Sequence, residues 1–156
     1  MNMKRRKHRW VWLIVAAYIY LIFRNSMMIA DVSEDMSMSV TYRILNLLER
    51  VGLYWADPWV FNGFIRKCAH FAEFAGLGFL VGLAMHISPL FKSRFLNFVL
   101  FLLTIPVSDE VIQYYTEGRS MQVSDMFLDG CGVLFGGFVS YVLILIIRDL
   151  FFRPKP

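Results

Sequence analysis

Residues 66–87 read RKCAHFAEFAGLGFLVGLAMHI, and this stretch combines the two features on which the fold depends. From residue 68 to residue 87 it is apolar and long enough to cross the hydrocarbon core of a bilayer, which takes about 20 residues. At about 100° per residue, Arg66, His70 and Glu73 fall on one face near the N-terminal end of the helix. Because lipid cannot solvate that face, the stretch predicts a membrane helix whose charged stripe faces other helices.

The composition indicates a chain made largely of such segments. Of the 156 residues, 58% are hydrophobic and only 18% are charged, which is too apolar for an ordinary soluble domain. Four apolar runs have a suitable length, and the predicted spans are residues 10–30, 68–87, 95–115 and 126–147. The sequence therefore predicts an all-α fold, a single integral membrane domain over residues 1–156 with a bundle of four transmembrane helices.

The basic residues predict the orientation of this bundle. They precede the first span, separate the second span from the third and follow the fourth: Lys4, Arg5, Arg6, Lys7, Arg9, Lys92, Arg94, Arg148, Arg153 and Lys155. The positive-inside rule then places both termini in the cytoplasm. We expect the first span to be retained rather than cleaved as a signal peptide, because no small-residue cleavage site follows it. Since the basic residues flank apolar segments, the net charge of +4 does not indicate nucleic-acid binding.

The first outer loop contains a shorter amphipathic pattern. Between residues 40 and 53, Ile44, Leu47, Leu48 and Val51 recur at helical spacing while the charged residues lie elsewhere. We expect a short amphipathic helix that lies along the outer surface of the membrane. A helix that caps the bundle from outside is the alternative.

Ionisable residues also gather at the outer ends of the last two spans. Asp109, Glu110 and Gln113 end the third span, and Arg119 follows in the short outer loop. The fourth span carries a stripe that is charged at its outer end and small further in, where another helix can approach closely: Asp125, Asp129, Gly132 and Gly136. The predicted topology brings these groups to the same depth as the charged stripe of the second span.

Several chemistries suit this cluster. Arg66, Lys67 and Arg119 would repel a cation and suit a phosphate or carboxylate ligand, so we expect no bound metal, and the residues do not identify a cofactor. One open alternative is proton exchange between His70 and a carboxylate. Another is a hard divalent cation held near His70 by the carboxylates, namely Glu73, Asp109, Asp125 and Asp129. A purely structural ring of ion pairs between helix ends is also open.

At these residues the sequence resembles the VanZ-like family of membrane proteins associated with glycopeptide resistance. The resemblance covers mainly the second half of the chain, and its ordered motifs are Arg66 to Phe74, Asp109 to Gln113, Gly118-Arg119 and Ser124-Asp125, followed by Gly132 and Gly136. The chain has Asp129 where the family pattern has an asparagine. Residues 23–26 only partly resemble the family's Phe-Ser-x-Gln-like stretch, and we assign them no role.

The resemblance implies a bacterial cell-membrane protein, in some relatives linked to lowered susceptibility to teicoplanin-type lipoglycopeptides. The first functional hypothesis is therefore that the protein binds or alters an anionic outer-leaflet lipid or lipid-linked precursor. The candidate ligand-binding residues are Arg66, Lys67, Gln113, Arg119, Asp125 and Asp129. The candidate catalytic or proton-moving residues are His70, Glu73, Asp109 and Glu110.

Other classes of function remain open at this point, and so does whether any reaction is catalysed. One is an intramembrane hydrolase or transferase that uses His70 as general base or nucleophile. Another is a proton-coupled transporter, which would require a homodimer because each chain has only four spans. The last is a small helper subunit whose polar cluster meets a partner protein.

Overall fold

The computed structural model describes residues 8–55 and 57–152. Over these residues it contains five helices and no strand: α1 Val11–Ser26, α2 Ala30–Arg50, α3 Pro58–Ile87, α4 Arg94–Tyr114 and α5 Val123–Phe152. The all-α prediction is confirmed. Part of the charge pattern used to predict orientation lies outside the described residues, namely Lys4, Arg5, Arg6, Lys7, Arg153 and Lys155.

Three helices, α3, α4 and α5, are each long and apolar enough to span a membrane. Helix α3 begins ten residues before the predicted span, because the Asp57 side chain caps it by accepting a hydrogen bond from the Trp59 N–H at 2.8 Å and Pro58 occupies its first turn. The chain is thus a multi-pass membrane protein with three spans, or four if the first bent helix pair counts as one.

The predicted first span, residues 10–30, is wrong in its extent. Helix α1 stops at Ser26, and the chain bends by 104° before α2 begins at Ala30. In a continuous helix the Ser26 carbonyl would accept a hydrogen bond from the Ala30 N–H. Instead the Ala30 N–H donates to the Glu117 carbonyl, and the Ser26 carbonyl accepts from Thr116 Oγ1 and Arg119 Nη1. Residues after α4 therefore bind the Ser26 carbonyl and the Ala30 N–H, the two groups that would pair with one another if α1 continued.

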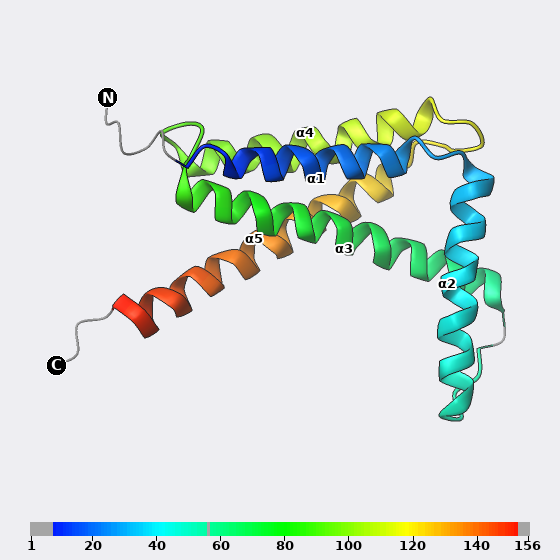
Figure 1. The fold of residues 1–156 in the computed structure, drawn as a ribbon. Helices are drawn as coiled ribbons and strands as arrows, with labels where there is room; N and C mark the ends of the chain where they lie inside the picture. The colour runs from blue at the N-terminus through cyan, green and yellow to red at the C-terminus, as the bar shows by residue number, and fades with distance from the viewer. Residues whose placement is uncertain (1–7, 56, 153–156) are drawn as a thin grey trace.

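Figure 1 shows how the helices are arranged. Helices α1, α3 and α4 run side by side, α5 crosses α3, and α2 turns away from the bundle and lies across one end of it. The α1–α2 turn, α2, the start of α3 and the α4–α5 loop meet at this end, which we call the site end. The α3–α4 connection and the last described turn of α5 lie at the opposite end.

Close packing between α3 and α5 depends on glycine. A Cβ atom on Gly136 would overlap the backbone carbonyl of Ala75, and one on Gly78 would overlap the carbonyl of Val133. Gly132 likewise faces the backbone at Phe71. The small-residue stripe predicted on the fourth span is confirmed as the surface that lets these two helices touch backbone to backbone.

Helix α2 differs from the predicted amphipathic helix of residues 40–53, because it starts at Ala30 and ends at Arg50. Its buried face is formed by Met38, Thr41 and Leu45. Thr41 Oγ1 donates a hydrogen bond to Asn62 Oδ1 of α3 at 3.0 Å, and both side chains are buried. The middle of α2 is thus anchored to α3.

Candidate functional site

Four of the five helices contribute the polar side chains at the centre of the site end. Asn25 and Ser26 come from the last turn of α1, His70 from α3, Asp109 from α4 and Asp129 from α5. One potential ligand atom from each of His70, Asp109 and Asp129 lies within 4.8 Å of the other two, and we call these three residues the carboxylate cluster. The two aspartates are fully buried.

Asp109 is held in place by two donors. Ser26 Oγ donates a hydrogen bond to Oδ1, and Gln113 Nε2, one turn along α4, donates to Oδ2 at 2.8 Å. Both oxygens of this buried carboxylate therefore have a neutral partner. The orientation of Asp109 depends on α1 as well as on its own helix.

Asp129 has a different environment. Its Oδ1 lies 3.6 Å from His70 Nδ1, which is longer than a hydrogen bond. Within the described residues neither carboxylate oxygen of Asp129 has a hydrogen-bond partner, and His70 Nδ1 has none either. A buried carboxylate without donors is costly, so this pair is the least satisfied part of the site.

Two glutamates flank the carboxylate cluster. Glu73 Oε1 accepts a hydrogen bond from Asn25 Nδ2 at 2.8 Å, which ties α3 to the end of α1. Glu110 is fully buried, and its Oε2 accepts from the backbone N–H of Gln122 at 2.7 Å. Glu110 thereby fixes the end of the α4–α5 loop.

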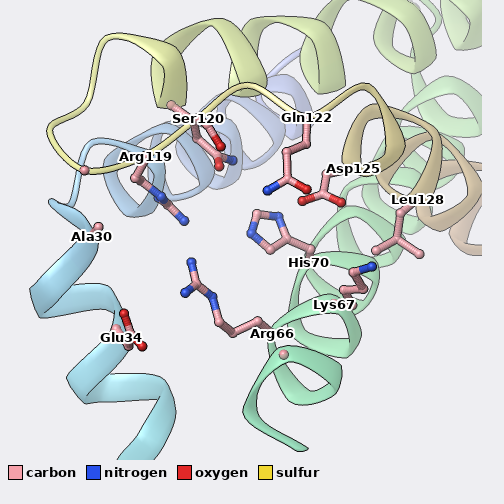
Figure 2. Close-up of a pocket in the computed structure, with 13 residues that line it drawn as sticks. Ala30, Glu34, Arg66, Lys67, His70, Arg119, Ser120, Gln122, Asp125 and Leu128 are labelled. Atoms are coloured by element: carbon pink, nitrogen blue, oxygen red, sulfur yellow. The ribbon is translucent and has the colours of Figure 1, made fainter. Parts of the chain in front are cut away.

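A polar cavity of about 330 Å³ opens beside the cluster (Figure 2). Arg66 and Arg119 point toward one another across it, and His70, Gln122 and Asp125 lie on its other side. Lys67 and Gln113 also line it, as does Glu34 of α2. The cavity therefore presents several positive and hydrogen-bonding groups to one small volume.

Arg119 owes its position to the glycine before it. Gly118 has φ +76°, a conformation that favours glycine, and a Cβ atom there would lie 2.8 Å from the Ala30 Cβ. The turn brings Arg119 Nη1 to 3.3 Å from the Asn25 carbonyl oxygen and 3.2 Å from that of Ser26. Burial lowers the pKa of the Arg119 guanidinium, and the positive charge of Arg66 lowers it further, although arginine remains charged at neutral pH.

A second cavity, of about 300 Å³, lies between α2 and α3 and has mainly apolar walls, to which Met28, Met36, Val40 and Ile65 contribute. We call it the apolar cavity. Arg66, His70 and Arg119 border it as well as the polar cavity. The two cavities therefore meet at three charged or ionisable side chains.

The structure brings together the ten residues singled out in the sequence, in two layers. Six of them line the polar cavity: Arg66, Lys67, His70, Gln113, Arg119 and Asp125. Glu73 borders the apolar cavity, while Asp109, Glu110 and Asp129 are fully buried. Among the described residues no lysine or arginine forms an ion pair with these carboxylates, and Asp125 accepts a hydrogen bond from Ser124 instead.

Four further site residues were missed. Asn25 and Ser26 lie in the stretch of partial family resemblance to which no role was assigned, so the structure corrects that interpretation. In the sequence, the signal that could have identified Asn25 and Ser26 was this partial match to the family pattern. Glu34 and Gln122 had no local signal, because their place beside the cavity depends on how α2 and the α4–α5 loop fold back.

The fold and the site together define a class, a multi-pass helical membrane protein with a buried carboxylate cluster beside a cationic cavity at one end of its bundle. Comparison with known proteins agrees with the sequence resemblance. The chain belongs to the VanZ/LLP1 family, whose sequence model matches residues 10–147. No curated protein and no solved structure matches the chain.

Proposed function

We propose that this protein binds an anionic, amphipathic lipid or lipid-linked cell-envelope precursor in the outer leaflet of a bacterial cell membrane, and thereby lowers susceptibility to teicoplanin-type lipoglycopeptides. The observation that carries the proposal is the junction of the polar and apolar cavities at Arg66, His70 and Arg119. A ligand with a charged head group and an apolar chain would use both cavities at once.

The head group is expected to be a phosphate or carboxylate. Arg66 and Arg119 face one another across the polar cavity and form no ion pair within the described chain (Figure 2). Guanidinium groups bind such anions with two parallel hydrogen bonds. An anion between them would also offset the repulsion between the two positive charges.

The proposed orientation is supported by the positive charges at the opposite end of the bundle. The α3–α4 connection and the last turns of α5 lie there, away from the site end (Figure 1), and they carry Lys92, Arg94 and Arg148. Under the positive-inside rule this end faces the cytoplasm, so both termini are cytoplasmic and the site end meets the outer leaflet.

Lipid binding can be measured directly by native mass spectrometry of the purified protein with dioleoylphosphatidylglycerol or dioleoylphosphatidylcholine added. We expect retention of the anionic lipid, and Arg119→Gln should weaken it by about tenfold or more, since hydrogen bonds to a charged group contribute about 1.5–3 kcal/mol. The matched control is Arg43→Gln, an exposed arginine on α2. Equal retention of the two lipids, or equal loss in both variants, would contradict the proposal.

The cellular consequence is tested by teicoplanin susceptibility in a sensitive Gram-positive host that expresses the wild-type chain, His70→Ala or His86→Ala at equal membrane levels. His86 is a suitable control because it lies exposed near the far end of the same helix. Protection by the wild type and His86→Ala, but not by His70→Ala, supports a ligand-binding or chemical role. No protection by any of the three excludes the resistance function.

An intramembrane hydrolase or transferase is the second candidate, and the proximity of His70 and Asp129 favours it. A histidine oriented by a buried carboxylate is a common general base. In that case the protein would convert a bound lipid-linked precursor into a new product, which mass spectrometry of the lipid extract would detect. Recovery of the unchanged lipid would contradict catalysis and support lipid binding only.

A further inference from the structure

We propose that His70, Asp109 and Asp129 bind one divalent transition-metal ion, Zn²⁺ or Mn²⁺, through one nitrogen and two carboxylate oxygens. The three donors come from α3, α4 and α5 and lie within 4.8 Å of one another. Imidazole and carboxylate together suit these two ions. The inference stands apart from anion binding in the polar cavity, so either can fail without the other.

Unbalanced negative charge is the first argument for the ion. Asp109 and Asp129 are fully buried next to one another, and no arginine or lysine in the described parts of the chain pairs with either. Asp129 has two buried oxygens without a hydrogen-bond donor, and His70 presents an unpartnered nitrogen to the same space. A cation bound by His70 Nδ1 and one of the Asp129 oxygens would give both residues a partner and offset the buried negative charge.

The spacing of the donors is the second argument. His70 Nδ1 and Asp129 Oδ1 are 3.6 Å apart, too far for a hydrogen bond. With metal–donor distances of about 2.0–2.2 Å, two donors of a tetrahedral site lie about 3.3–3.6 Å apart. The observed separation of this pair therefore agrees with two ligands of one ion, and the Asp109 oxygen lies within 4.8 Å of both.

The hydrogen bonds around Asp109 have the form expected of a supported metal ligand. Ser26 and Gln113 donate to different oxygens of this carboxylate and hold its plane. Each carboxylate oxygen has two lone pairs, so a donor on one leaves the other free for an ion. Such supporting contacts typically change metal affinity by about 10–100-fold when they are removed.

In the sequence analysis, three cationic residues argued against a bound metal. In the structure these residues lie in a different layer from the buried aspartates. Arg66, Lys67 and Arg119 line the polar cavity, whereas Asp109 and Asp129 are buried outside its walls, and His70 is the member of the cluster that borders it. Three protein donors leave the fourth tetrahedral position open. That position would take a water molecule or an anion.

The experiment uses the full chain in nanodiscs, stripped with chelator and then equilibrated with Zn²⁺, Mn²⁺ or Co²⁺. We expect one Zn²⁺ or Mn²⁺ per chain by elemental analysis, and tetrahedral d–d absorption bands for Co²⁺. If folded wild-type protein retains none of the three ions, the cluster is neutralised by protons and the metal site is rejected.

Two variants then locate the ion. Asp129→Asn keeps the shape of the side chain and should weaken ion binding by at least about tenfold, and Ser26→Ala should do so by about 10–100-fold. The control is Asp35→Asn, which removes an exposed carboxylate from α2 and should leave binding unchanged. Equal affinity in Asp129→Asn and the control would overturn the assignment to this cluster.

Discussion

The contact between α3 and α5 at Gly136 leads to a quantitative prediction. In Gly136→Ala the new Cβ would overlap the Ala75 carbonyl, and because this obstacle is backbone, no side-chain rotation can relieve it. The helices must separate, and overpacking of this kind costs about 1–3 kcal/mol. Alanine is favoured over glycine in a helix by about 1 kcal/mol, which partly offsets that cost.

The matched control is Gly130→Ala on the same helix, whose Cβ would lie 3.8 Å from Leu102 Cδ1 in ordinary contact. Since both variants share the gain in helix propensity, the difference between their free energies of unfolding isolates the overpacking, about 1–3 kcal/mol. Reversible unfolding in mixed micelles, followed by circular dichroism, measures it. If the two variants are equally stable, the helices do not approach as closely as described.

The same substitution bears on the site. Asp129 lies two turns before Gly136 on α5, and its nearest ionisable partner, His70, lies on α3. A displacement of α5 from α3 would therefore lengthen the His70–Asp129 separation. Gly136→Ala should weaken Zn²⁺ binding in the chelator-stripped protein, whereas Gly130→Ala should not.

Two further predictions concern buried hydrogen bonds. Ser26→Ala removes a donor from the buried Asp109 carboxylate and should lower the free energy of unfolding by about 1–3 kcal/mol, whereas the exposed Ser39→Ala should have no effect in the same unfolding assay. Thr41→Val leaves the buried Asn62 oxygen without its donor, so the amides of α2 should exchange hydrogen faster than in the wild type, while those of α4 should not. Unchanged exchange in α2 would show that other contacts hold this helix.

The sequence predicted what depends on local pattern. Apolar length located α3, α4 and α5, and helical spacing placed His70 and Glu73 on one face. The early end of α1 could not be predicted in this way, because Ser26 and Ala30 form hydrogen bonds with residues about 90 positions later in the chain. No short window of sequence contains that interaction.

The same reason limited the prediction of the site. Asp109 and Asp129 were recognisable as charges in apolar helices, which are rarely there without a function. Their layering was not, since only the packing of α3, α4 and α5 together shows that the aspartates lie buried while the arginines line a cavity. The buried carboxylate cluster and the arginine-lined cavity beside it appear as one mixed cluster in the sequence.

The contacts that residues of α1 and α3 make with acidic residues of later helices also bear on biogenesis. Asn25 precedes Glu73, Ser26 precedes Asp109 and His70 precedes Asp129, so each acid has its neutral or basic partner on a helix synthesised before it. An aspartate at the centre of an isolated helix costs about 2.5–3.5 kcal/mol during insertion by the translocon. With helices entering in chain order, these three acids reach the bilayer after the earlier residues beside which they come to lie.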